Sequence, residues 1–390
     1  MAVTVVTNIG VLVSGDIKNT VLKDNTIIIR DGKIAAIGDG SLAEQAQKET
    51  PGVQVIDAGG MTVMPGLIDS HVHPVLGDFT PRQKTLDFIS SALHGGVTTM
   101  ISAGECHTPG RPKDPVGTKA LAIVAHKSSA NERPAGVKLH GGALILEKGL
   151  VEADFAELAA AGVWLVGEVG LGSIKKPEDA APMVQWAKNN GMKVMMHTGG
   201  TSIPGSSTVT AADVIAVDPD VVSHVNGGPT AISPAEVDRL IEETKLALEI
   251  VQCGNIKIGD MVVRKLAKKG ELGRIIFGND APSGTGLIPL GILRNIAQVA
   301  GMSGVSAAEA IAMATGNTAK VYGLNTGVIA VGKEADLVIA DKPMGSIGSN
   351  ALEALEAGDL PGVAMVLIDG KILVNKSRNT PPAERSVTVR

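Results

Sequence analysis

The sequence predicts an α/β protein, namely a (β/α)8 TIM barrel with a small β-sandwich domain built from both chain ends. Short apolar runs alternate with helical patterns through the middle of the chain, and β-branched runs broken by tight turns occupy both ends. The middle segment also has the length that eight strand–helix units require. We therefore expect the barrel over residues 66–323 and the composite β domain over residues 1–65 and 324–390.

The two chain ends share one sequence pattern. Near the start, β-branched runs are separated by Asp-Gly, Gly-Gly and Pro-Gly turns, as in TVVTNIGVLVS, NTIIIRDGKIAAIG and VQVIDAGGMTVM. The pattern returns near the end of the chain in TGVIAVGKEADLVIAD and GVAMVLIDGKILV. These runs are typical of hairpin strands, and we expect the two ends to form one domain beside the barrel.

The central segment contains the strands that the barrel requires. Longer helical patterns separate them, and one of these begins with a capping signal, Ser233-Pro234 followed by Glu236. The alternation is typical of a parallel sheet covered by helices. The predicted strands are GLIDSHVH, VTTMISAG, GVKLHGG, VWLVGEVG, KVMMHTGG, VVSHVNGG, ALEIVQCG and RIIFGNDAP.

Composition excludes several function classes. The 390 residues are 44% hydrophobic with a net charge of -5, but include only four Phe, two Trp and one Tyr, which argues against nucleic-acid binding. Cys106 and Cys253 are too few for a disulfide framework, and we expect them to be packing or rim residues of a cytoplasmic protein. The chain shows no signal peptide and no apolar run long enough for a membrane span.

Histidines mark the ends of the predicted strands. His71 and His73 end the first strand and share a face because strand residues alternate; we expect Leu67 and Asp69 to be in phase behind them. A single histidine is more often a hydrogen-bonded imidazole of the core than a metal ligand. The cluster is stronger evidence for a metal site than any single histidine, because barrel active sites lie at the carboxyl ends of the strands.

Three further residues complete this pattern. His197 ends the fifth strand, His224 the sixth, and Asp280 the eighth. Imidazole and carboxylate ligands suit zinc, iron, manganese or nickel. Because one catalytic zinc ion needs only three protein ligands, the set favours two divalent metal ions.

Two metal ions need a bridging anion, and two residues are candidates. Glu168 ends the fourth strand, which we expect to place it in phase with Val166 and Trp164. Lys138 on the third strand bridges only if it is carboxylated. We favour Glu168, because a glutamate in an apolar strand is costly if it is buried without a partner.

The ordered motifs resemble the amidohydrolase superfamily over the whole chain. They are PGLIDSHVH, the histidines of strands five and six, FGNDAP, and the closing ATGNTAKVYGL and GVIAVGKEADLVIAD. The resemblance implies a binuclear centre with a bridging carboxylate at Glu168. The implied ligands of one metal ion are His71, His73 and Asp280, and those of the other are His197 and His224.

Longer segments, among them HGGALILEKGL, VGEVGLG and MHTGGTSIPGSST, resemble one branch of that superfamily. This implies hydrolysis of a cyclic enamide, 6-oxo-1,4,5,6-tetrahydronicotinate, to 2-formylglutarate and ammonia in nicotinate degradation. It also implies zinc and iron as the two metal ions, and a homotetramer. The expected mechanism is attack by a metal-bridged hydroxide, with Asp280 as general base and then general acid.

Alternatives stay open at this stage. The fold and the ligand set fit another cyclic amidase, such as a dihydroorotase-, imidazolonepropionase- or isoaspartyl-dipeptidase-like enzyme, or a non-catalytic barrel scaffold. The implied substrate is small and anionic, so a cation should meet its carboxylate, and Lys138, Arg82 and Arg111 are candidates. His140 either binds substrate or simply occupies the barrel mouth.

Overall fold

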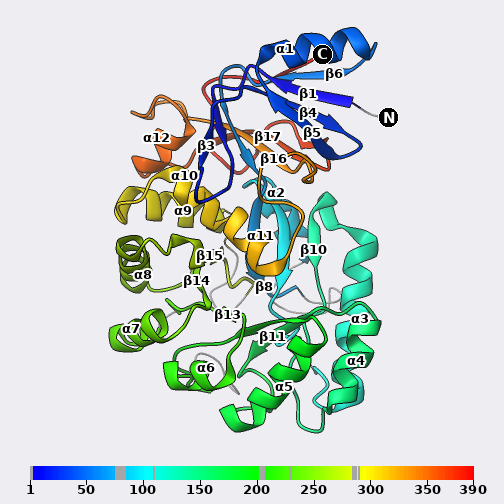
Figure 1. Ribbon diagram of the computed structural model, residues 1–390, viewed down its shortest axis with the longest axis vertical. Helices are drawn as coiled ribbons and strands as arrows, with labels where there is room; N and C mark the ends of the chain where they lie inside the picture. The colour runs from blue at the N-terminus through cyan, green and yellow to red at the C-terminus, as the bar shows by residue number, and fades with distance from the viewer. Residues whose placement is uncertain are drawn as a thin grey trace.

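A computed structural model describes residues 3–74, 85–108, 110–201, 207–227, 231–282, 288 and 290–390. Its larger part is a barrel, and a smaller β-rich part lies at one end of it, where both chain termini are found (Figure 1). The fold class predicted from the sequence, a TIM barrel with an added β-rich domain, is confirmed.

Each of the predicted barrel strands is present, and the neighbouring strands pair in parallel. They form two sheets in the orders β10-β9-β8 and β11-β12-β13-β14-β15, which isolated parallel bridges join at Leu144–Val166 and Val72–Ala281. The strands are β8 Leu67–Val72, β9 Val97–Ser102, β10 Lys138–His140, β11 Leu165–Val169, β12 Lys193–Met196, β13 Val221–Val222, β14 Ala247–Val251 and β15 Ile275–Gly278.

Helices separate these strands in the chain and surround them in space (Figure 1). The predicted cap of α7 is present, since the Ser233 hydroxyl accepts a hydrogen bond from the Glu236 backbone N–H. The helices are α2 Thr85–Leu93, α3 Pro115–Glu132, α4 Glu152–Ala160, α5 Pro177–Asn189, α6 Ala211–Val217, α7 Pro234–Glu243, α8 Ile256–Lys269, α9 Gly291–Met302, α10 Ala307–Met313 and α11 Gly316–Tyr322, with single 3-10 turns η1 Pro134–Gly136 and η2 Leu272–Arg274.

The β-rich part consists of two sheets, in the orders β19-β6-β1-β4-β5 and β18-β17-β16-β7-β2-β3. Both sheets combine strands from the beginning and the end of the chain, and aliphatic side chains from both fill one core. The elements are β1 Val3–Thr7, β2 Val11–Val13, β3 Val21–Leu22, β4 Thr26–Arg30, β5 Lys33–Gly38, α1 Gly40–Glu49, β6 Gln54–Asp57, β7 Thr62–Pro65, β16 Leu337–Asp341, α12 Ala351–Glu356, β17 Gly362–Ile368, β18 Lys371–Val374 and β19 Thr388–Val389.

The first barrel strand departs from simple alternation. Between two of its pairs with β9, Asp69 with Met100 and Val72 with Ser102, strand β8 contains one residue more than its partner. This bulge resets the phase of the side chains that follow it. Leu67 packs in the helix-facing core, so our expectation that it is in phase with the two histidines is wrong.

A second bulge lies in β11. Val166 pairs with Val194 and Val169 with Met196, so β11 also carries one extra residue there. Val166 consequently packs in the helix-facing core, whereas the Glu168 carboxylate reaches the histidines at the end of the barrel. Our expectation that Glu168 and Val166 are in phase is therefore wrong, and the bulge directs Glu168 to the site.

Candidate metal centre

The ends of three strands bring four side chains to one point. His71 Nε2 and His73 Nε2, from the end of β8, are 3.2 Å apart. Oε2 of Glu168 lies 3.6 Å from the first of these nitrogens and 3.5 Å from the second. Oδ1 of Asp280, which follows β15, lies 3.5 Å and 3.1 Å from the same two nitrogens.

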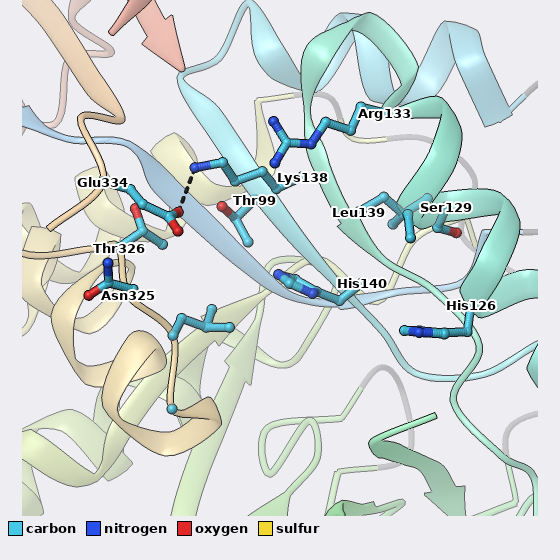
Figure 2. Close-up of a pocket in the computed structure, with 13 residues that line it drawn as sticks. Thr99, His126, Ser129, Arg133, Lys138, Leu139, His140, Asn325, Thr326 and Glu334 are labelled. Carbon is cyan, nitrogen blue, oxygen red and sulfur yellow. Dashed lines mark hydrogen bonds and ion pairs between the residues drawn. The ribbon is translucent and has the colours of Figure 1, made fainter. Parts of the chain in front are cut away.

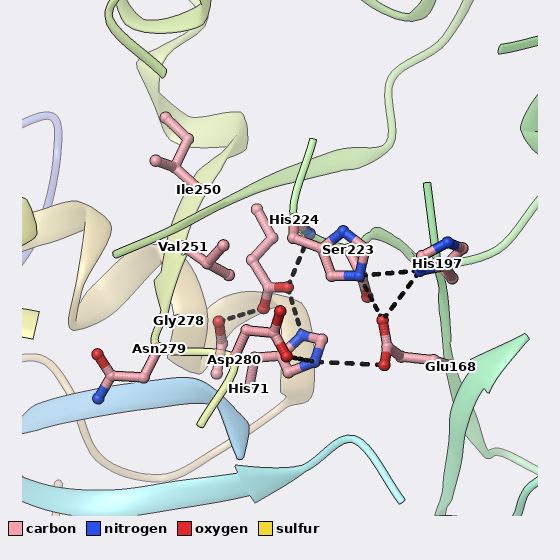
Figure 3. A network of polar contacts seen from close by, with 12 residues as sticks. His71, Glu168, His197, Ser223, His224, Ile250, Val251, Gly278, Asn279 and Asp280 are labelled. Carbon is pink, nitrogen blue, oxygen red and sulfur yellow. Dashed lines mark hydrogen bonds and ion pairs between the residues drawn. The ribbon is translucent and has the colours of Figure 1, made fainter. Parts of the chain in front are cut away.

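A second group forms on the other oxygen of the same glutamate. Oε1 of Glu168 lies 2.6 Å from His224 Nε2 and 3.8 Å from His197 Nδ1, and these two nitrogens are 3.2 Å apart. Figure 3 shows the carboxylate between His71 on one side and the other two histidines on the other. The two oxygens of Glu168 thus face two separate sets of imidazoles.

Both groups lie at the carboxyl ends of the barrel strands, and two of their residues have unusual backbone angles. His224 has a φ of 32° and Asp280 a φ of 53°, in the left-handed region that non-glycine residues rarely adopt. Backbone conformations of this kind concentrate at functional sites, where the surrounding structure holds them in place.

The charges within the site stabilise one another. Burial alone would lower the pKa of His71, but the carboxylates of Glu249 and Glu168 outweigh burial and hold it well above its usual value. Burial likewise opposes ionisation of Glu168, yet His71 and His224 hold the pKa of that carboxyl well below its usual range. The anionic form of Glu168 is therefore favoured at neutral pH.

Glu249 on β14 is a site residue that sequence reasoning missed. Its Oε2 accepts a hydrogen bond from His71 Nδ1 at 2.7 Å and one from the His224 backbone N–H at 3.1 Å. Its Oε1 accepts a hydrogen bond from Ser70 Oγ. The sequence did contain a signal for Glu249, because this glutamate interrupts the apolar run ALEIVQCG in the same way as Glu168 interrupts its own strand. In the structure Glu249 is fully buried.

Other buried contacts orient His73 and the loop that carries Asp280. The Gly104 carbonyl accepts a hydrogen bond from His73 Nδ1 at 3.2 Å, which leaves Nε2 facing the group. Asp69 accepts hydrogen bonds from the backbone N–H and the side-chain amide of Asn279, the residue before Asp280. Burial raises the pKa of Asp69 to about 7. Asp69 thus braces the loop that carries Asp280.

The chain's two thiols contact these same ligands. Cys106 Sγ lies 3.4 Å from Nδ1 of His73, and Cys253 Sγ lies 3.7 Å from Oδ2 of Asp280. Both cysteines are partly exposed, and they are not joined in a disulfide. They line the site rather than pack in the core.

The donor set fits metal ions. At both places where ring nitrogens approach to 3.2 Å, a carboxylate oxygen completes the group, and all the ligand atoms of each set lie within 4.8 Å of one another. In neutral His71 and His73 the Nδ1 atoms donate to Glu249 and Gly104, so two Nε2 lone pairs face each other. A divalent cation would bind both nitrogens and the carboxylate.

The candidate substrate contacts are not gathered at this centre. Lys138 begins β10, at the opposite end of the strand from the metal-ligating positions, and its Nζ lies 2.6 Å from Glu334 (Figure 2). The same Nζ lies 2.7 Å from Asp336 and 2.7 Å from Asp369. A lysine paired with three carboxylates joins the barrel to the β-rich part. The structure therefore does not bring Lys138 to the centre, either as a carboxylated bridge or as a substrate contact.

The other three candidates have different surroundings. His140 lines a cavity of about 380 Å³ beside Lys138 and packs edge-on against Trp164, and burial lowers its pKa to about 4. Arg111 Nη1 forms an ion pair with the fully buried Glu147 at 2.7 Å. Arg82 lies outside the described residues.

Known proteins resemble the chain over all or most of its length. It is 66% identical over 389 residues to enamidase of Eubacterium barkeri, with 100% of both chains covered. A crystal structure of enamidase superposes with a TM-score of 0.96 at 65% identity, again over 100% of both chains. Adenine deaminase of Ruegeria is 26% identical over 329 residues, 82% of this chain and 51% of that protein.

A more distant likeness concerns the fold alone. A β-aspartyl dipeptidase of Fervidobacterium islandicum superposes with a TM-score of 0.68 at 18% identity, over 98% of this chain. Among the described residues, the helices are too short or too polar to cross a membrane. The model of the amidohydrolase family matches residues 62–373, which contain all six proposed metal ligands. The chain therefore belongs to the amidohydrolase family, whose members depend on metal ions.

Proposed function

We propose that this chain is a metal-dependent cyclic amidase that hydrolyses 6-oxo-1,4,5,6-tetrahydronicotinate to 2-formylglutarate and ammonia. The full-length likeness to enamidase supports the activity and makes the chain a hydrolase of C–N bonds. The observation that carries the mechanism is the position of Glu168, whose two oxygens face two sets of imidazoles.

In this proposal the chain binds two divalent cations, zinc and iron. His71, His73 and Asp280 would hold one cation, His197 and His224 would hold the other, and Glu168 would offer one carboxylate oxygen to each. A metal pair held in this way lowers the pKa of water and polarises the amide carbonyl. Glu249 and the Gly104 carbonyl keep the two β8 imidazoles oriented through their Nδ1 atoms.

Asp280 is the residue that moves the proton. Its Oδ1 faces the imidazoles, while its side chain remains 19% exposed, which is more than for the other residues of its group. We assign it to take a proton from the attacking water and deliver it to the ring nitrogen as the C–N bond breaks. The opened enamine then tautomerises to an imine, and a second water converts the imine to the aldehyde and ammonia.

The test compares substrates on the purified, metal-loaded protein. Loss of the conjugated enamide's ultraviolet absorbance, with release of ammonia, is the expected result. Dihydroorotate, hydantoin and imidazolone propionate are the comparison rings, and turnover of one of them without turnover of the enamide would refute the substrate assignment. We further propose a cytoplasmic homotetramer on the basis of the sequence resemblance, and sedimentation velocity measures the subunit number.

A further inference from the structure

A second group of potential ligands adjoins the candidate metal centre at His73. The loop after β9 carries Cys106 and His107, and the ligand atoms of these two residues and His73 lie within 4.8 Å of one another. Cys106 Sγ is 3.4 Å from His73 Nδ1, and the rings of His73 and His107 meet edge-on with centroids 4.6 Å apart. The proposed reaction uses neither Cys106 nor His107.

The local backbone holds these two side chains in place. Cys106 and His107 are the central residues of a turn in which the Thr108 backbone N–H donates to the Glu105 carbonyl at 3.1 Å. The Thr108 hydroxyl also donates to the Glu105 carboxylate at 2.9 Å. The ligand atoms of Cys106, His107 and His73 already lie within 4.8 Å of one another, so the turn needs no large rearrangement to receive a cation.

Exposure distinguishes Cys106 and His107 from the inner imidazoles. His71, His73, Glu168 and the other inner imidazoles are buried, whereas Cys106 and His107 are both partly exposed. A cation in solution can therefore reach the outer pair first. Thiolate and imidazole together favour zinc, cobalt or cadmium over magnesium and calcium, which prefer oxygen ligands.

We propose that Cys106, His107 and His73 form an additional site for a thiophilic divalent cation such as zinc. The site fills when such cations are present in excess of the inner pair. The cation bonds to the sulfur and to one nitrogen of each ring, and the protons of the Cys106 thiol and of His73 Nδ1 pass to solvent. The proposal rests on this cluster and does not depend on the identity of the substrate.

His73 couples the outer site to the inner one. Its Nδ1 donates to the Gly104 carbonyl while its Nε2 faces the inner ligands. A cation that takes Nδ1 replaces that hydrogen bond, which otherwise orients the ring for the inner cation. Filling the outer site should therefore weaken the hold of His73 on the inner cation, and excess zinc should inhibit turnover.

Cobalt gives a test that reports the sulfur directly. Co²⁺ is added to the metal-loaded protein, and the near-ultraviolet thiolate-to-cobalt charge-transfer absorbance is recorded while bound metal is counted by equilibrium dialysis and atomic emission. We expect the band to grow with one further equivalent of cation beyond the inner pair. Cys106→Ser should abolish the band and the extra equivalent, and Cys253→Ser, which removes the chain's other thiol, should retain both.

Two outcomes would overturn the proposal: no thiolate band in the wild type, or a band that Cys253→Ser removes and Cys106→Ser leaves. If Cys106→Ser does not fold, His107→Ala provides the second variant, and half-saturation of its band should move to a cation concentration at least ~10-fold higher. An unchanged half-saturation in His107→Ala would equally refute the site. In a variant that loses the thiolate-to-cobalt band, excess zinc should also no longer inhibit turnover.

Discussion

Replacement of Glu249 by glutamine should weaken metal binding without disturbing the packing around it. In the structure Oε2 of Glu249 accepts hydrogen bonds from His71 Nδ1 and the His224 N–H, and Oε1 accepts one from Ser70. A glutamine carbonyl can replace Oε2, and its NH₂ can donate to Ser70 Oγ, because that hydroxyl can turn its single proton to the Phe277 carbonyl 2.8 Å away. The change therefore removes the negative charge behind His71 and keeps the hydrogen-bond geometry.

The expected magnitude follows from that geometry. Loss of a carboxylate partner of a metal-ligating histidine lowers metal affinity by about 10–100-fold, which corresponds to about 1.4–2.7 kcal/mol of binding free energy. Competition against a chromophoric chelator measures the affinity on the folded protein, and circular dichroism verifies the fold.

Glu147→Gln is the matched control. Glu147 is also fully buried, and it accepts hydrogen bonds from Arg111 at 2.7 Å and from the Ser173 backbone N–H at 2.9 Å, yet it belongs to neither metal-ligand group. This variant should lose stability but keep the wild-type metal affinity. Wild-type affinity in Glu249→Gln, or an equal loss in both variants, would refute the reasoning.

Four further predictions concern the centre and the domain junction. Glu168→Ala should lose both cations and turnover, as measured by metal content and ammonia release. Lys138→Met should keep both metal ions but lower the free energy of unfolding by about 3–5 kcal/mol, because it leaves the buried Asp336 carboxylate without the ammonium group that pairs with it. Urea titration measures this loss. Asp280→Asn should retain the fold and depress turnover by at least ~100-fold, as a steady-state assay would show, because it removes the acid–base group. Burial lowers the pKa of His140 from 6.5 to about 4. The contribution of neutral His140 to the free energy of unfolding should therefore be complete above pH 6.5 and decline as the pH falls toward 4. The urea midpoint of His140→Gln should lack this part of its pH dependence.

Sequence reasoning located the strands well, because each one is an apolar run between turn residues and each proposed ligand ends a run. It placed Leu67 and Val166 on the wrong face, because it assumed that side chains alternate along the whole strand. Each strand has a bulge, and the one extra residue there reverses the alternation. The assignment of Glu168 came from the cost of burying a charge, and the same reasoning applied to β14 would have found Glu249.

Local sequence patterns could not predict which residues surround Lys138. Its three partners, Glu334, Asp336 and Asp369, all lie near the other end of the chain, and the pairing depends on how the β-rich part packs against the barrel. Similarly, contacts such as that of Cys106 with His73 arise between loops, whose paths neither periodicity nor turn signals predict. Such long-range ion pairs and loop contacts require the folded structure.

The interleaving of the chain ends in the β-rich sheets has a consequence for the order of folding during synthesis. β7 lies between β2 and β16, so its pairing cannot be completed until a segment made after the whole barrel has left the ribosome. Until then Val63 and the other aliphatic residues in the core of the β-rich part remain partly exposed to solvent. We expect the nascent barrel to form first and to remain next to an open sheet edge, which is the state that a chaperone would protect.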